Sequence, residues 1–147
     1  MKSLFAFFLV LGFTNAPQWQ LNMEQAKIEA KSSNKLILLN FSGSDWCGPC
    51  IKLKKEVFES DAFLTYAGQH LVLVRADFPR LKKNQLSSQQ TTHNETLAER
   101  YNPDGQFPLT VLIDASGKEL RHWVGYPASL NVQTLVNEID ALHAAAH

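Results

Sequence analysis

Residues 36–53 join an apolar run, two closely spaced cysteines and the beginning of a helical pattern. The run at 36–41 is bounded by turn-forming residues, which is typical of a strand buried on both faces of a sheet. Residues 42–44 form the loop after it, and Cys47 and Cys50 follow with two residues between them. Because open α/β sheets place their sites where strands end, this order predicts an α/β fold with the cysteines at the carboxyl edge of the sheet.

The other elements are predicted from the spacing of apolar residues and from turn signals. Further strands are expected at residues 71–78, 109–114 and 119–124, the last two antiparallel because only a short turn joins them. Helices are expected at residues 21–33, from Cys47 to about Tyr66 with a break near Ser60 and Asp61, from about Ser88 to Tyr101, and at 132–142. This pattern predicts one α/β domain, residues 17–147, with a central mixed four-stranded sheet flanked by helices and an extra N-terminal helix.

The N-terminus has the layout of a secretory signal peptide. Lys2 supplies a short positive region, residues 4–13 are apolar, and Ala16 is a small residue at the expected cleavage point. The apolar run is short for a bilayer span, and the alternatives are an uncleaved anchor or a buried N-terminal helix. We therefore expect residues 1–16 to be removed and the protein to be exported, either to a periplasm or out of the cell.

The composition argues against some partners and directs attention to the cysteines. Lysine and arginine together number 14, as do aspartate and glutamate, so no overall charge favours nucleic acid or an anionic membrane. Exported proteins normally use paired cysteines as structural cross-links, but both cysteines of this chain lie in one C-x-x-C motif. The pair is therefore better suited to chemistry than to joining distant segments.

The C-x-x-C motif has the geometry for thiol–disulfide exchange. Cys47 falls at the first turn of a predicted helix, where unpaired N–H groups and the helix dipole favour the thiolate that attacks a disulfide. Cys50 lies one turn later, where it can resolve the mixed disulfide. Gly48 leaves room for a substrate chain, and Pro49 costs no hydrogen bond in a first turn. The alternatives are a metal site, a structural bridge and inert thiols, and no second C-x-x-C or spaced histidine pair supports a zinc site.

The segment Trp46-Cys47-Gly48-Pro49-Cys50 is similar to the active-site pattern of the thioredoxins. The order of elements over residues 20–143 resembles the thioredoxin fold. The longer segment 40–47 resembles exported thioredoxin-like proteins of the disulfide-isomerase type. The resemblance therefore implies the thioredoxin fold for this chain.

The same resemblance implies two further parts of the site. Phe107–Pro108 stands where thioredoxins carry a cis-proline that faces the cysteines, with the backbone of Phe107 pairing with a bound peptide. Gly125 stands in the loop that borders the substrate groove. An ordinary trans proline and a simple strand-to-helix turn are the alternatives at these places. Trp46 and Phe107 could form an apolar rim beside the sulfurs, which Trp123 and Tyr126 could extend unless they pack in the core.

One position departs from the thioredoxin pattern. Thioredoxins carry a buried acid in the strand before the motif, and the matching residue is Asn40, which cannot titrate. Its role in proton transfer is then absent or belongs to another group or to water. Arg75 or Asp77 could supply a charge, although both also fit a solvated strand end, and Asp45 is a loop or capping residue rather than a base. The polar stretch 80–94 either contacts partners or is a solvated loop.

From the motif and the resemblance together we expect a thiol–disulfide oxidoreductase that acts on exported protein substrates. Gly48–Pro49 resembles the reducing members of the family, which favours a reductase. Disulfide isomerase or oxidase activity is one alternative, and a metal-handling, copper-delivery module on the same fold is another. No cofactor is expected, because the chain has no nucleotide or flavin fingerprint and the Cys47–Cys50 pair is itself the redox centre.

The expected partners follow from the same reasoning. They are proteins with disulfides or thiols, and an extracytoplasmic or membrane-bound thiol that gives or takes electrons, because the reducing systems of the cytosol do not reach an exported protein. We expect no nucleic acid and no bound metal, and we expect a monomer.

Overall fold

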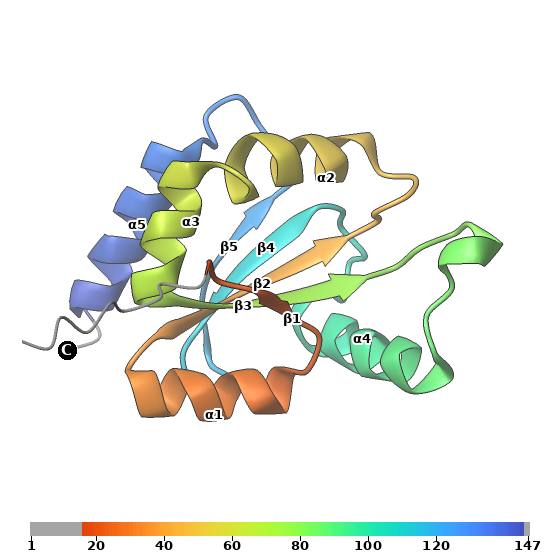
Figure 1. Ribbon diagram of the computed structural model, residues 1–147, viewed down its shortest axis with the longest axis horizontal. Helices are drawn as coiled ribbons and strands as arrows, with labels where there is room; N and C mark the ends of the chain where they lie inside the picture. Colours follow the sequence, from red (N-terminus) through yellow and green to blue (C-terminus); the bar gives the residue numbers. More distant parts are fainter. Residues whose placement is uncertain (1–15, 146–147) are drawn as a thin grey trace, which may run out of the picture.

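The computed structural model of the protein describes residues 16–145 (Figure 1). Its strands are β1 (Trp19–Gln20), β2 (Leu36–Ser42), β3 (Leu71–Asp77), β4 (Leu109–Ile113) and β5 (Glu119–Val124). Its helices are α1 (Met23–Ser33), α2 (Gly48–Leu53), α3 (Asp61–His70), α4 (Ser88–Tyr101) and α5 (Val132–Ala145), with a π-helical turn (Lys54–Phe58) after α2 and a 3-10 turn (Lys82–Asn84) before α4. The sheet lies between two helical layers, with α1 and α4 on one face and α2, α3 and α5 on the other (Figure 1).

The sheet is mixed, as predicted, and has the strand order β1-β3-β2-β4-β5. Strands β1, β3 and β2 are parallel, whereas β4 runs antiparallel to β2 and β5 antiparallel to β4. The prediction of four strands was short by one, because β1 also belongs to the sheet and pairs Trp19 with Leu73. A strand of two residues is too short to show an alternating pattern, so its sequence carries no strand signal.

Burial on both faces of β2 is confirmed, and it explains the apolar run that predicted this strand. Ile37, Leu39 and Phe41 pack in one core cluster with residues of α1 and α4. Leu36 and Leu38 pack in the other, with residues of the helices on the opposite face. Successive side chains of a strand point to opposite faces, so a strand covered on both sides must be apolar throughout. Since β2 is also the central strand of the sheet, the loop that follows it, residues 43–47, lies at the carboxyl end of that central strand.

The helix predicted from Cys47 onward is interrupted, as the sequence indicated. A π-helical turn follows α2, and the chain then restarts as α3, whose N-terminus is capped by Ser60. The Ser60 hydroxyl accepts a hydrogen bond from the N–H of Phe63 at 3.3 Å. Serine favours this capping position because its side chain satisfies an N–H that has no partner within the helix. The second helix ends at His70, four residues beyond the predicted end.

Of the two N-terminal predictions, a signal peptide and a first helix, the structure covers the helix. The predicted signal peptide lies outside the described residues except for Ala16. The first helix begins at Met23 and is capped by the side chain of Asn22, two residues later than predicted. Within residues 16–145, no helix has the length and apolar character needed to cross a membrane.

Candidate active site

Cys47 and Cys50 form a disulfide bond at the start of α2, with a distance of 5.2 Å between their Cα atoms. Cys47 is the N-cap residue of this helix, and its Sγ accepts a hydrogen bond from the backbone N–H of Cys50 at 3.3 Å. Gly48 and Pro49, between the cysteines, are exposed. When the bond is reduced, an N–H group at this position stabilises a thiolate on Cys47, because hydrogen bonds to a charged form favour that form.

The exposure of the two cysteine residues is low and similar. Cys47 is 5% exposed and Cys50 is 3% exposed. These fractions are too close to distinguish the two cysteines, and the hydrogen bond from the Cys50 N–H to Cys47 Sγ does so instead. The arrangement suits attack by Cys47 and resolution by Cys50.

The loop that precedes Cys47 is fixed by a carboxylate from β3. Asp77 accepts hydrogen bonds from the backbone N–H of Ser44 at 2.9 Å and from the hydroxyl of Ser44. Gly43 is required in this loop because a Cβ atom there would collide with the indole ring of Trp46. The Trp46 indole N–H donates to the carbonyl of Phe78 at 2.7 Å. Asp77 is therefore a loop anchor and not a solvated strand end.

Asp45 also has a structural role, as predicted. Its carboxylate accepts hydrogen bonds from the backbone N–H groups of Arg80 and Leu81, at 2.9 and 3.0 Å, and from the amide of Asn84 at 2.9 Å. The hydrogen bond from Arg80, followed by that from Asn84, lowers the pKa of Asp45 below its usual range. The carboxylate thus stays ionised and joins the loop before Cys47 to the segment after β3. No sequence signal pairs residues 35 or more positions apart, so this contact was not predicted.

The structure brings the predicted wall of the site together with Trp46. The Phe107–Pro108 peptide bond is cis, as the resemblance implied. The rings of Trp46 and Phe107 meet edge to face with 5.4 Å between their centroids, so the predicted apolar rim is present. The N–H of Gly125, a residue with φ of 67°, donates to the carbonyl of Pro108 at 2.8 Å. Pro108 is thereby held between the loop that contains Gly125 and the start of β4.

Trp123 does not extend the rim and packs in the core instead. It belongs to the cluster beneath α5, and its indole N–H donates to Glu138 Oε2 at 2.8 Å. Tyr126 packs against the same cluster, and its hydroxyl donates to Glu56 Oε2 at 2.8 Å. The rim therefore consists of Trp46 and Phe107, with Phe78 packed against Phe107 at 5.5 Å between ring centroids.

Asn40 occupies a buried polar position on the face of β2 that α2 and α3 cover. It is 3% exposed, and its amide donates to Thr110 Oγ1 at 3.2 Å and to the carbonyl of Leu109 at 3.4 Å. Both partners belong to β4, which continues from Pro108. An amide can satisfy these acceptors, but it neither takes up nor releases a proton at neutral pH. Asn40 therefore has a structural role here in joining β2 to β4.

Replacing Asn40 with aspartate should make stability depend on pH. The carboxylate of Asn40→Asp would be buried against the Leu109 carbonyl, which raises its folded pKa. A carboxyl whose pKa is higher in the folded than in the unfolded protein lowers the free energy of unfolding as pH rises above its unfolded pKa of about 4. At pH 8 we expect this loss to be about 1–3 kcal/mol, the usual cost of a buried polar group whose hydrogen bonds are not satisfied. Urea unfolding at pH 4 and pH 8 measures this. Equal destabilisation at both pH values would contradict the account, and Asn40→Ser is the uncharged control.

Arg75 does not replace the acid that thioredoxins carry. Its Cζ atom lies 4.4 Å from the ring centroid of Trp19, on β1. Since β1 pairs with β3 on the side away from β2, the guanidinium is directed toward the edge of the sheet. Burial lowers the pKa of Arg75, an effect that Asp77 and Glu59 oppose. Its Nε atom has no hydrogen-bond partner among the described residues.

Metal-binding side chains are not clustered in the described part of the chain. Within residues 16–145, no three His, Cys, Asp or Glu side chains are arranged to hold a metal ion.

Known proteins share this architecture. Disulfide bond reductase DsbH of Chlamydia pneumoniae is 41% identical over 103 residues, which make up 70% of this chain and 60% of that protein. Thioredoxin-related protein DsbJ of the same organism is 29% identical over 102 residues, or 69% of this chain and 28% of that protein. The solved structure of DsbH oxidoreductase matches with a TM-score of 0.77 and 31% identity over 97% of this chain and 95% of that one.

The two curated relatives are longer than the region they share with this chain, which spans 60% and 28% of their lengths. The match to the solved structure confirms the predicted thioredoxin fold. A family model of the thioredoxin-like domain matches residues 23–139, from the start of α1 into α5. The chain therefore belongs to the thioredoxin-like domain family.

Proposed function

We propose that the protein is a thiol–disulfide oxidoreductase that exchanges disulfides with exported proteins and acts as a reductase. One observation carries the proposal: the Cys50 N–H donates to Cys47 Sγ at the first turn of α2. A sulfur that caps a helix and accepts a backbone N–H is stabilised as a thiolate, which is the species that attacks disulfides. The 41% identity to a disulfide bond reductase supports the same chemistry.

The reaction needs only the two cysteines. In the reduced protein, the Cys47 thiolate attacks one sulfur of a substrate disulfide, the substrate S–S bond breaks, and its other sulfur leaves as a thiolate that takes a proton. The Cys50 sulfur then attacks Cys47 Sγ, which forms the Cys47–Cys50 disulfide and releases the first substrate sulfur. The substrate gains two electrons and two protons, and the protein is left in the oxidised state that the structure shows.

The apolar rim and the cis-proline provide a surface for the substrate chain. Trp46 and Phe107 are half-buried, their rings contact each other, and Trp46 directly precedes Cys47 in the chain. Gly48 and Pro49 are exposed and leave the approach to the sulfur open, and the resemblance to thioredoxins assigns Pro108 and Gly125 to the facing wall. A polypeptide with a disulfide can therefore pack apolar side chains on the rim while its backbone lies along Phe107.

Export and electron supply complete the proposal. The N-terminal leader, residues 1–16, directs the chain out of the cytosol, to a periplasm or beyond the cell. Electrons then come from an extracytoplasmic or membrane-bound thiol protein, and no bound cofactor takes part, because the cysteine pair itself carries the two electrons. The protein acts as a monomer.

The reduction potential of the purified protein tests the direction of electron flow. A reductase is expected to have a potential near that of thioredoxin, about −270 mV, and to reduce insulin with dithiothreitol as the donor. A potential of about −180 mV would indicate an isomerase, and one of about −120 mV an oxidase. Equilibration with glutathione and dithiothreitol buffers, read by thiol alkylation, gives the value. Binding of one Cu(I) per chain without insulin reduction would contradict oxidoreductase activity and support a metal-handling module.

A further inference from the structure

The segment between β3 and α4 is a basic projection beside the candidate active site. Residues 79–86, called here the basic arm, contain Arg80, Lys82 and Lys83, and no acidic residue lies between Asp77 and Glu95. All three basic side chains are exposed. Figure 1 shows the arm extending past the carboxyl end of β3, clear of the helical layers. The charge is concentrated locally, because the whole chain has equal numbers of basic and acidic residues.

The basic arm is fixed to the residues that precede Cys47. Asp45 accepts hydrogen bonds from two backbone N–H groups of the arm and from the Asn84 amide. The guanidinium of Arg80 lies over the ring of Trp46, with Cζ 3.7 Å from the centroid. These contacts join the arm to the two residues immediately before the nucleophile. The position of the arm relative to Cys47 is therefore set by the fold.

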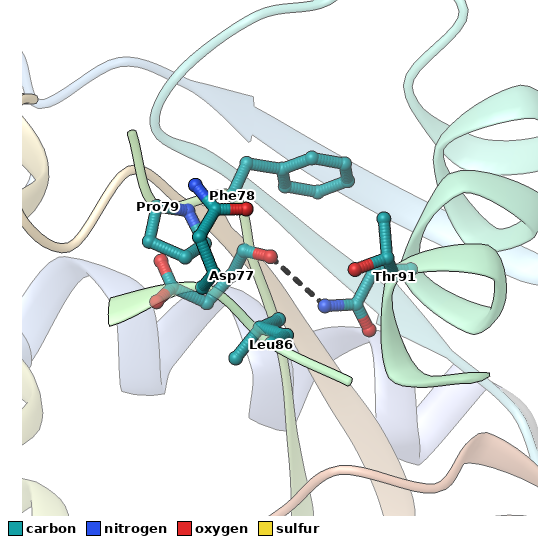
Figure 2. Close-up of a pocket in the computed structure, with 7 residues that line it drawn as sticks. Asp77, Phe78, Pro79, Leu86 and Thr91 are labelled. Carbon is teal, nitrogen blue, oxygen red and sulfur yellow. Dashed lines mark hydrogen bonds between the residues drawn. The ribbon is translucent and has the colours of Figure 1, made fainter. Parts of the chain in front are cut away.

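The base of the basic arm is held against α4, with a small pocket between them. Asn94 donates from its buried amide to the carbonyl of Asp77 at 2.9 Å, the contact drawn as a dashed line in Figure 2. The pocket, of about 100 Å³, is lined by Phe78 just before the arm, by Pro79 and Leu86 at the two ends of the arm, and by Thr91 and Asn94 of α4 (Figure 2). The arm is thus anchored at its base, and its tip is left outside the body of the protein.

The two lysines at the tip of the basic arm are not paired with other side chains in the described part of the chain. The side chains of Lys82 and Lys83 form no hydrogen bond or ion pair with any residue in the range 16–145, whereas Lys54 is paired with Glu59 at 3.4 Å. Leu81, between the charged residues, is 49% exposed. The three basic residues of the arm outnumber the one carboxylate bound to it, Asp45, so the excess charge is positive.

We propose that the basic arm is a docking surface for acidic polypeptide substrates of the Cys47–Cys50 pair. Its occupant is a protein segment with Asp or Glu near the disulfide and an apolar residue that can contact Leu81. Fixed surface charge of one sign speeds the encounter with a partner of the opposite sign, and salt weakens the effect. The inference rests on the proposed function, because it concerns the substrates of that same site.

Two oxidised peptides and a charge reversal test this docking surface. The peptides share one disulfide and differ only in flanking residues, which are acidic in one and basic in the other. Wild-type protein is expected to reduce the acidic peptide with the higher kcat/KM. In Lys82→Glu/Lys83→Glu the kcat/KM for the acidic peptide should fall about tenfold at low salt, and the preference should reverse. Both differences should shrink in 0.5 M salt.

The matched control reverses two exposed lysines at the other end of the sheet. Lys31 lies near the end of α1, and Lys118 lies in the turn between β4 and β5; both are near the start of β2, and the cysteines follow its end. Lys31→Glu/Lys118→Glu has the same change in net charge and should keep the wild-type preference. An equal loss in this control would mean that net charge alone acts, and would overturn the proposal.

A small neutral disulfide separates this proposal from the activity on which it rests. Both double variants should reduce hydroxyethyl disulfide at the wild-type rate, since none of the four lysines forms a hydrogen bond or ion pair with Cys47 or Cys50. Wild-type protein that does not reduce it would overturn the proposed function and the docking proposal with it. Reduction of the neutral disulfide without a charge preference between the peptides would overturn the docking proposal alone. Binding of the basic arm to anionic lipid vesicles in place of any peptide preference would also overturn it.

Discussion

Cys47→Ser is expected to lower the rate of insulin reduction to the uncatalysed level, a loss of at least about a thousandfold. A serine hydroxyl at this position does not ionise near neutral pH and is a far weaker nucleophile than a thiolate. The fold should persist, because Ser is also a good N-cap residue and can accept the N–H of Cys50. Insulin turbidity measures the loss, and the absence of a change in unfolding cooperativity confirms that the protein is folded.

Cys50→Ser is the matched comparison, because it removes the same disulfide while leaving the proposed nucleophile in place. This variant should react once with a substrate and stop at a mixed disulfide on Cys47, since the resolving sulfur is missing. Mass spectrometry of the trapped product identifies the attacked residue. Trapping by Cys47→Ser and none by Cys50→Ser would reverse the assigned roles of the two cysteines.

Phe41→Ala is expected to destabilise the folded state by about 3–5 kcal/mol, the usual cost of removing a fully buried aromatic ring. Phe41 is completely buried in β2 and stacks on Phe78, with 6.5 Å between the ring centroids. The loss has two parts, the apolar area returned to water on unfolding and the cavity left in the core. Urea unfolding of the oxidised protein measures it.

Ile28→Ala is the control for this prediction. Ile28 lies on α1 but is 65% exposed, so its truncation should change the free energy of unfolding by no more than about 0.5 kcal/mol. A loss below about 1 kcal/mol in Phe41→Ala would mean that the site is filled by rearrangement, and would contradict the packing described here.

The four longer strands and the last two helices could be predicted because their signals are local. A continuous apolar run indicates a strand buried on both faces; β2 and β3 each begin with one, and in β4 only Thr110 interrupts it. The helix α4 begins at Ser88, as predicted, because Ser87 caps it by accepting the N–H of Gln90 at 3.1 Å. The cysteine pair and the cis bond at Pro108 were also predicted, the first from spacing and the second from the resemblance.

Other features depend on contacts between distant residues and have no local signal. Leu21 and Ile28 are exposed although both are apolar, whereas Met23, Ala26 and Ala30 of α1 are buried. The pattern alone could not show which side of a weakly amphipathic helix meets the sheet. The contacts of Asp45 with the basic arm join residues 35 to 39 positions apart. Neither the fixed conformation of the arm nor its position beside Trp46 could therefore be predicted from the sequence.

The most direct test of the central claim is a count of thiols in a single turnover. The fully reduced protein is mixed with a limiting amount of a protein disulfide, the reaction is stopped with acid, and free thiols are alkylated and counted by mass spectrometry. Thiol–disulfide exchange through Cys47 and Cys50 predicts that each substrate disulfide opened yields two substrate thiols and one Cys47–Cys50 disulfide. A substrate that stays oxidised while Cys47 and Cys50 both remain alkylatable would contradict the account.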